Sequence, residues 1–160
     1  MAPRRLSQKA VTMSETLSRQ RRAECLCGGL IVTARGEPKQ VYACSCRDCQ
    51  RRSGSAFTYA AIFSEDAVAV TGAYRTWRRR SDSGRFIENG FCPNCGTTVF
   101  FRGDGFPGMT GVAVGCFADR DFPRPDRLYW ATRRHHWLLL CDGLAELPTQ
   151  PGVALPPEPS

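Results

Sequence analysis

The sequence has no long hydrophobic run. Its longest apolar stretches, such as Trp137–Leu140, are far shorter than the roughly 20 apolar residues that a membrane-spanning helix needs. The first 22 residues also lack the apolar core of a secretory signal, and no heptad or glycine repeat indicates a coiled coil or collagen. These absences predict a soluble, cytoplasmic protein with no membrane partner.

Acidic residues are scarce at the N-terminus, where residues 1–22 hold six Lys or Arg and one Glu. The whole chain carries +7, so the body beyond residue 22 is close to neutral. We interpret residues 1–22 as a disordered basic leader rather than a nucleic-acid-binding arm. Residues 148–160 contain five prolines and are predicted to form a disordered tail. One domain is therefore expected over residues 23–147, in a chain of 160 residues.

Short runs of β-branched and aromatic residues, bounded by Gly, Pro or Asp, predict a mainly β fold with antiparallel sheets. A helical turn is expected at Arg47–Ser53, and a second, shortened by Pro123 and Pro125, near Asp121. The predicted strands are Leu30–Thr33, Gln40–Ala43, Ala56–Phe63, Val68–Thr71, Tyr74–Trp77, Arg85–Glu88, Thr97–Phe101 and Gly111–Val114. The basic triple Arg78–Arg80 is expected in an exposed hairpin turn.

Nine cysteines are present, an odd number that argues against a disulfide framework when no export signal precedes them. Seven of them form three clusters, which is typical of metal ligands. Alternate residues of a strand point to the same side, so a C-x-C can present two thiolates to one ion. A C-x-x-C turn folds its second thiolate back toward the first. The clusters are Cys25 and Cys27, then Cys44, Cys46 and Cys49, then Cys92 and Cys95.

Seven ligands divide most simply into four and three. A structural zinc takes four protein ligands, whereas a catalytic zinc takes three and keeps one position open. Two pairs, Cys25 with Cys27 and Cys92 with Cys95, would form the closed site, and the local triplet would form the open one. Two zinc ions per chain are therefore predicted. A competing partition joins Cys46 and Cys49 to Cys92 and Cys95 as a zinc ribbon, but it strands the other three cysteines.

The three motifs together are similar to those of the glutathione-dependent formaldehyde-activating enzyme family, which also includes centromere protein V. They are Glu24–Gly29, Cys44–Gly54 and Gly90–Thr97, and the resemblance runs from about Ala23 to Leu140. It implies an Mss4-like fold, a structural zinc on Cys25, Cys27, Cys92 and Cys95, and a second zinc on Cys44, Cys46 and Cys49. Ser45 stands where many members carry His, and Cys116 where many carry a small polar residue.

Chemistry favours a thiol at the open position. Three thiolates leave zinc with a net charge of −1, which makes it a poor activator of water but suits it to a fourth thiolate. Such a sulfur can attack an aldehyde carbon, and the reverse step breaks a carbon–sulfur bond. The family resemblance implies glutathione as the thiol and formaldehyde as the aldehyde. Arg47, Arg51 and Arg52 flank the triplet and are candidates to hold glutathione carboxylates, with a solvated helix face as the alternative for each.

Two other functions remain open at this stage. The chain could be a zinc-stabilised protein-binding module in which both metals are structural, with Cys116 or a histidine as the eighth ligand. It could also be a nucleic-acid zinc ribbon, which only the basic leader favours. By itself Cys116 is more typical of a small buried residue than of a ligand. Cys141 is expected at the edge of the core, and His135 and His136 at the surface.

Overall fold

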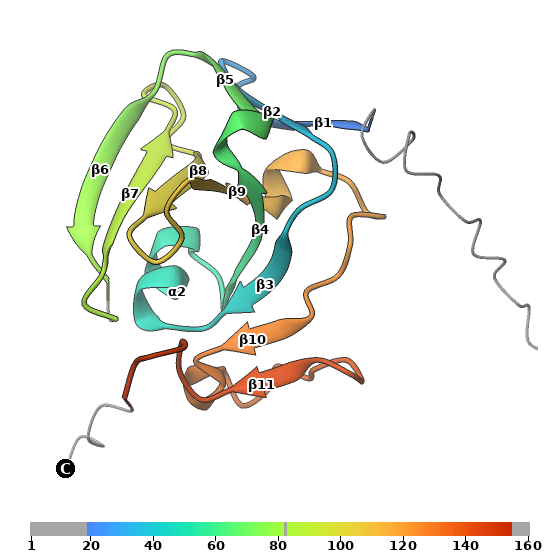
Figure 1. The fold of residues 1–160 in the computed structure, drawn as a ribbon, viewed down its shortest axis with the longest axis vertical. Helices are drawn as coiled ribbons and strands as arrows, with labels where there is room; N and C mark the ends of the chain where they lie inside the picture. Colours follow the sequence, from blue (N-terminus) through green and yellow to red (C-terminus); the bar gives the residue numbers. More distant parts are fainter. Residues whose placement is uncertain (1–18, 82, 155–160) are drawn as a thin grey trace, which may run out of the picture.

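The computed structural model describes residues 19–81 and 83–154, and it contains two β-sheets (Figure 1). The smaller sheet has the order β1-β2-β5 and consists of β1 (Gln20–Glu24), β2 (Leu30–Arg35) and β5 (Val68–Gly72). The larger sheet has the order β11-β10-β3-β4-β9-β8-β7-β6. Its strands are β3 (Gln40–Cys44), β4 (Thr58–Ser64), β6 (Arg75–Arg80), β7 (Phe86–Phe91), β8 (Thr98–Gly103), β9 (Met109–Ala113), β10 (Arg127–Tyr129) and β11 (Ala145–Leu147).

The prediction of a mainly β fold is confirmed. The strand pairs are antiparallel, as expected, except around β10, which runs parallel to both β3 and β11. Sequence patterning missed β1, β10 and β11, because strands of three to five residues with few apolar positions give only a weak alternation signal. β10 pairs with β3 and β11, which are distant in sequence, whereas β1 pairs with the next strand, β2.

Among the described residues, helical structure is limited to short elements. The α-helix α2 spans Arg47–Ser53, as predicted, and three 3₁₀ turns occupy η1 (Glu65–Ala67), η2 (Val114–Phe117) and η3 (Ala131–Arg133). The helical turn predicted near Asp121 does not form, since this segment has no regular structure. No helix among the described residues has the length and apolar content needed to cross a bilayer.

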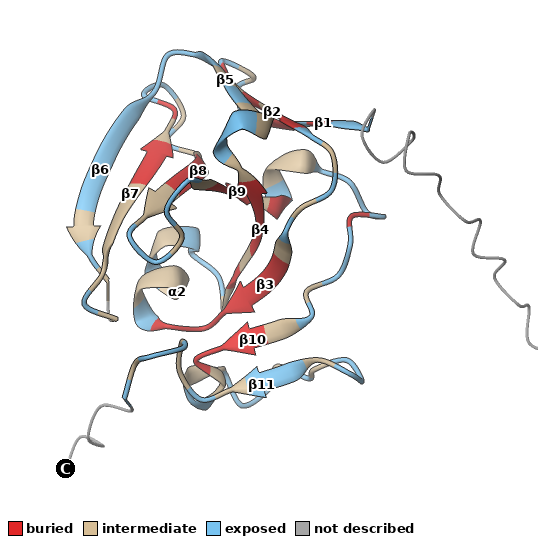
Figure 2. Ribbon diagram, in the orientation of Figure 1, coloured by how far each residue is buried: buried red, intermediate tan, exposed pale blue. Residues whose placement is uncertain are grey.

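Both faces of the larger sheet are buried, and Figure 2 shows the buried positions concentrated in its central strands. In β4, Ala61 and Phe63 belong to one hydrophobic cluster, whereas Ala60 and Ile62 belong to another. Alternate residues of a strand point to opposite faces, so the two clusters lie on opposite sides of the sheet. The small sheet packs on the first side, and the cysteine triplet with α2 lies on the second.

The described structure extends beyond residues 23–147 at both ends. Residues 20–22, expected in the leader, belong to β1, where Arg21 is buried and donates to Gly36 O and to Glu37. At the other end, Val153 packs against the second hydrophobic cluster. The rest of the leader (residues 1–18) and of the tail (residues 155–160) lie outside the described residues.

Candidate metal centres and their pocket

Four sulfur atoms meet where the two sheets join. Cys25 and Cys27 lie in the turn after β1, and Cys92 and Cys95 lie in the turn after β7. All four sulfurs are within 4.8 Å of one another, and Cys27 Sγ is 3.6 Å from both Cys25 Sγ and Cys92 Sγ. A disulfide would need about 2.05 Å. A tetrahedral zinc with Zn–S bonds of about 2.3 Å would separate its sulfurs by about 3.8 Å, so the group fits zinc.

The two turns share one backbone design. Gly28 and Gly96 both adopt a φ of +74°, and their N–H groups donate to Cys25 O and Cys92 O at 2.9 Å. A residue with a side chain would be strained at this φ. Hydrogen bonds also favour ionised sulfur, since Thr97 lowers the pKa of Cys95 to about 5 through its hydroxyl and its N–H. The site is thus prepared for thiolate ligands.

The second group contains Cys44, Cys46 and Cys49, whose sulfurs also lie within 4.8 Å of one another. Cys44 ends β3, Cys46 is the N-cap of α2, and Cys49 lies in its first turn, where its N–H donates to Cys46 Sγ at 3.3 Å. A helix N-terminus favours negative charge. The spacing therefore gathers three sulfurs at the exit of one strand and the start of one helix.

The triplet does not carry three negative charges by itself. Hydrogen bonds from Cys44, and then from Cys46, lower the pKa of Cys49. The pKa of Cys44 is raised, because its thiol donates to Cys46 and Cys49 and because it is buried. Three crowded thiolates repel one another. A cation that binds between them removes this repulsion, so the donor set fits a thiophilic metal such as zinc.

Partners far away in the sequence hold the triplet in place. Ser45 is fully buried, and its N–H donates to Tyr129 O in β10 at 2.9 Å. The side-chain amide of Gln50 donates to Ser45 O at 2.7 Å and to Arg133 O at 2.9 Å. The parallel strand β10 thus anchors the segment between the first two cysteines.

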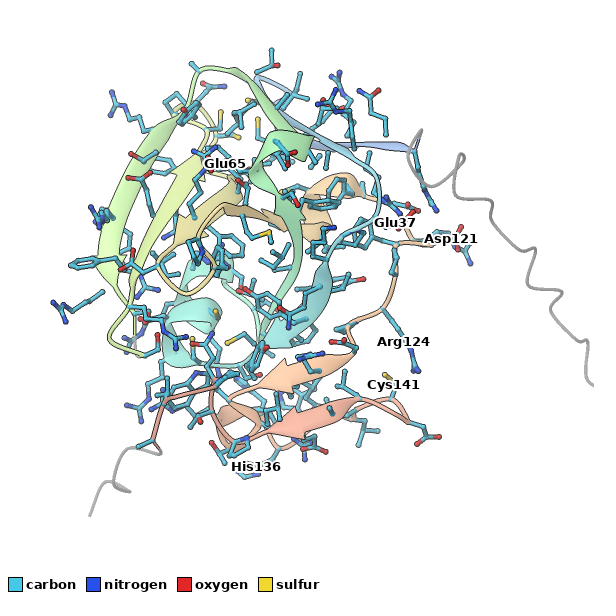
Figure 3. All side chains as sticks on the ribbon, in the orientation of Figure 1. Glu37, Glu65, Asp121, Arg124, His136 and Cys141 are labelled. Atoms are coloured by element: carbon cyan, nitrogen blue, oxygen red, sulfur yellow. The ribbon has the colours of Figure 1, made fainter. Side chains whose placement is uncertain are left out.

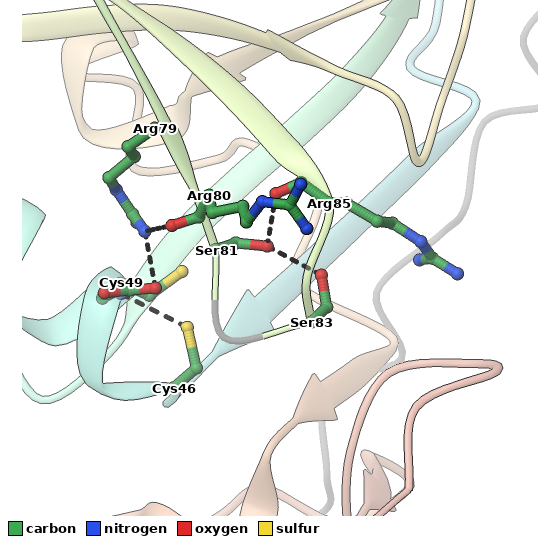
Figure 4. Close-up of polar contacts among 8 residues, drawn as sticks. Cys46, Cys49, Arg79, Arg80, Ser81, Ser83 and Arg85 are labelled. Atoms are coloured by element: carbon green, nitrogen blue, oxygen red, sulfur yellow. Dashed lines mark hydrogen bonds and ion pairs between the residues drawn. The ribbon is translucent and has the colours of Figure 1, made fainter.

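A pocket of about 270 Å³ opens over the triplet. Cys46 and Cys49 line it, whereas Cys44 does not and is buried beneath. Aromatic and aliphatic side chains form much of the wall, and arginines and serines from the β6–β7 hairpin form the rim (Figure 4). The polar members are Gln40, Asp48, Arg52, Arg79, Ser81, Ser83, Arg85 and Gln150; the apolar ones include Tyr42, Ile62, Ile87, Phe101, Phe106, Tyr129, Trp130 and Pro151.

Of the three arginines that the sequence placed beside the triplet, only Arg52 lines this pocket. Its guanidinium lies 4.8 Å from the centre of the Phe101 ring and donates to Thr58 Oγ1 at 3.2 Å. Arg47 and Arg51 are exposed and are not part of the wall. Seven residues of helix cannot turn every arginine toward one side.

Sequence reasoning missed Arg79 and Arg85, which come from the β6–β7 hairpin. The basic triple was expected in a turn, but Arg78–Arg80 form the end of β6. Strand alternation then points Arg79 toward the pocket and its two neighbours away. Only the pairing of this hairpin with the rest of the sheet brings Arg79 near α2, so no local signal revealed it.

The remaining candidate ligands lie apart from the triplet. Cys116 packs against the first hydrophobic cluster and its sulfur donates to Thr98 O at 3.7 Å. Burial, and then the nearby Cys25, raise its pKa to about 11.

Cys141, expected at the core edge, is exposed beside Arg124, and His136 is exposed at the lower edge of the view in Figure 3. His135 contacts Gln50 Oε1 at 3.2 Å. Within residues 19–81 and 83–154, none of these four candidate ligands joins a metal-ligand group.

The family model of the glutathione-dependent formaldehyde-activating enzyme matches residues 20–133, and the chain belongs to this family. Among solved structures, the crystal structure of a Rhodobacter sphaeroides protein is 22% identical, with a TM-score of 0.48, over 59% of this chain and 85% of that one. No curated protein sequence matches the chain. The matched range includes all seven clustered cysteines and ends before β11.

Proposed function

We propose that this protein is a cytoplasmic, zinc-dependent carbon–sulfur lyase that forms and cleaves the adduct of a thiol with a small aldehyde. Glutathione and formaldehyde are the proposed substrates, in keeping with the family. One zinc, held by Cys25, Cys27, Cys92 and Cys95, would be structural. The other, held by Cys44, Cys46 and Cys49, would belong to the reaction site.

One observation carries this proposal: the triplet has three sulfurs, and two of their residues face a pocket. Among the described residues, no further Cys, His, Asp or Glu completes this group. A tetrahedral ion on Cys44, Cys46 and Cys49 has one vertex left. With Cys44 buried below and the other two cysteines in the pocket wall, that vertex is expected to face the pocket.

The reaction needs an ionised thiol and a confined aldehyde. When bound, zinc keeps a coordinating thiol deprotonated at neutral pH. In the forward direction a carbon–sulfur bond forms between the thiol sulfur and the carbonyl carbon while the carbon–oxygen π bond breaks. The aldehyde oxygen then takes up the proton that the thiol released. The apolar wall, which includes Phe101 and Trp130, limits the water that competes for the aldehyde. Arg52 adds positive charge near Cys49, which favours an anionic thiol substrate.

The closed cluster is proposed to have a structural role because it joins segments from both sheets. Cys25 and Cys27 follow a strand of the small sheet, and Cys92 and Cys95 follow a strand of the large one. A hydrogen bond from Leu26 N–H to Thr97 Oγ1 at 3.3 Å spans the same junction. Metal at this point would contribute directly to folding.

Cobalt substitution tests the open vertex, because sulfur-to-cobalt charge-transfer bands grow with each thiolate that binds. We expect glutathione to strengthen these bands in the wild type, whereas S-methylglutathione, which has no free thiol, leaves them unchanged. Cys46→Ser, which removes one ligand, should abolish the response. A triplet spectrum that already shows four thiolates before glutathione is added would contradict the proposal and favour a binding module with two structural metals.

A further inference from the structure

The rim of the pocket is built by two segments that are distant in sequence. One is the β6–β7 hairpin, which contributes Arg85, and the other is a C-terminal strap, defined here as residues 148–154, which contributes Gln150 and Pro151. The strap lies beyond residue 133, where the match to the family model ends. This part of the pocket wall therefore lies outside the range that the family model matches.

Several contacts hold the strap against the domain. Val153 packs into the second hydrophobic cluster, and Thr132 Oγ1 donates to Pro148 O at 3.2 Å. Within the strap, Thr149 Oγ1 donates to Val153 O at 2.7 Å. Arg85 completes the attachment, because its Nη2 donates to Pro151 O at 3.0 Å. The strap is consequently part of the folded wall, although its prolines predicted a disordered tail.

Arg85 lies in a space that two glycines leave open. A Cβ atom on Gly105 would stand 3.2 Å from Arg85 Cδ, and one on Gly152 would stand 3.5 Å from Arg85 Nη2. Figure 4 shows Arg85 at the end of the β6–β7 hairpin, next to Ser81 and Ser83. The side chain is thus positioned by the strap, by the hairpin and by the absence of neighbouring side chains.

Among the described residues, no carboxylate neutralises the charge of Arg85. Of its five N–H donors, one donates to the neutral carbonyl of Pro151. Arg79, by contrast, is paired with Asp48 at 2.6 Å. A guanidinium at the rim of a pocket matches a carboxylate, because two parallel N–H···O bonds can form.

We infer that Arg85 and the C-terminal strap form a carboxylate-binding subsite that selects the thiol substrate by its distal end. This inference rests on the proposed function, in which the substrate sulfur points to the triplet at the floor of the pocket. The ligand class is a small thiol with a carboxylate several bonds from the sulfur. A pocket of about 270 Å³ is near the lower end of the range for small-molecule sites, which suits such a ligand.

Isothermal titration of the zinc-loaded full chain with S-methylglutathione tests the subsite without requiring a bond to metal. We expect Arg85→Met to weaken binding about tenfold, the loss typical of a charge-assisted hydrogen bond. Arg78→Met is the matched control, because Arg78 lies on the same hairpin, is exposed and does not line the pocket. It should change the affinity by less than about twofold. Equal binding by wild type and Arg85→Met would overturn the inference.

A second ligand separates carboxylate recognition from general damage to the pocket. The dimethyl ester of S-methylglutathione keeps the shape of the ligand but removes both negative charges. Esterification should cost the wild type about tenfold in affinity and should cost Arg85→Met much less, because the partner of the carboxylate is already absent. The same loss in both proteins would show that Arg85 does not contact a carboxylate, and would overturn the inference.

The role of the strap is tested by ending the chain after Leu147. We expect the truncated protein to lose S-methylglutathione affinity about as much as Arg85→Met does, and the two changes combined to lose no more. If truncation prevents folding, Gly105→Val displaces the Arg85 stem while the strap is kept, and the same loss is expected. Unchanged S-methylglutathione affinity of the truncated protein would show that the strap does not contribute to the subsite, and would overturn the inference. Failure of the proposed function can be told apart from failure of this subsite, because it would leave the cobalt spectrum unchanged when free glutathione is added.

Discussion

The carboxylate of Asp48 accepts a hydrogen bond from Arg79 at 2.6 Å, and this ion pair joins α2 to the edge strand β6. Asp48 stands between Cys46 and Cys49, so the bond connects the triplet segment to the hairpin that forms the rim of the pocket. Both side chains are less than one-fifth exposed. The geometry of the pocket therefore depends on an interaction between residues 31 positions apart.

Removal of this ion pair should destabilise the protein. We expect Asp48→Asn to reduce the free energy of unfolding by about 1–3 kcal/mol, because the largely buried Arg79 side chain loses its charged partner. Urea unfolding measures the change. Asp121→Asn is the control, since the pair between Arg120 and Asp121 spans 3.9 Å and is almost fully exposed; it should have no measurable effect. An equal loss in both variants would show that the Asp48 contact has no special role.

The two cysteine groups should respond differently to mutation. Elemental analysis of protein purified without chelator should show two zinc ions per wild-type chain. Cys46→Ser should retain one zinc and much of the fold, whereas Cys92→Ser should lose soluble protein, because it breaks the junction between the sheets. Soluble yield and zinc content measure both effects. Two variants that fold equally well would contradict the structural and catalytic assignments.

Glutathione binding to the triplet should depend on pH. A thiol must lose its proton to become a metal ligand, so binding releases a proton. The apparent affinity should rise with pH up to the thiol pKa of about 8.5 and level off above it. The cobalt spectrum, titrated with glutathione between about pH 6 and 9, measures this trend. A flat profile would indicate that the thiol stays protonated and does not ligate the metal.

Cys116 should resist alkylation. Its pKa is raised to about 11 by burial and then by the charge of Cys25, so the thiolate fraction is small below that pH and grows as pH rises toward it. At pH 8 only about one molecule in a thousand carries the reactive thiolate. With both metals bound, iodoacetamide should label the exposed Cys141 first, as mass spectrometry of peptides can show. Prior labelling of Cys116 would mean that it is not packed as described.

A glycine in the sheet makes room for the aromatic wall of the pocket. A Cβ atom on Gly111 would meet the Phe101 ring at 2.3 Å. Gly111→Ala should therefore displace Phe101 and cost about 1–3 kcal/mol, as measured by urea unfolding. Gly115→Ala is the control, because Gly115 is exposed and no atom beyond its chain neighbours and its own helical turn lies within 4 Å of its added Cβ. It should change stability by less than about 0.5 kcal/mol. Equal effects would argue against a tight Gly111–Phe101 contact.

Much of the central sheet could be predicted from sequence. The runs that became β4 and β8 combine branched and aromatic residues over several positions, and the predicted ranges overlap the observed strands. The predicted turn Arg47–Ser53 coincides with α2. The short strands β10 and β11 could not be predicted, because their pairing depends on neighbours distant in the chain and because three residues carry too little pattern.

The sequence by itself determined which cysteines gather within each motif, because the spacings C-x-C, C-x-x-C and C-x-C-x-x-C place sulfurs together through local backbone geometry. The meeting of Cys25 and Cys27 with Cys92 and Cys95 depends on the junction of the two sheets. The division into four and three followed from the number of ligands. Only the tertiary structure decided what surrounds the triplet. The pocket is lined by Arg52, but not by Arg47 or Arg51, and also by Arg85 and the C-terminal strap. Strand pairing and helix orientation set the direction of each side chain, and both depend on contacts between residues distant in the sequence.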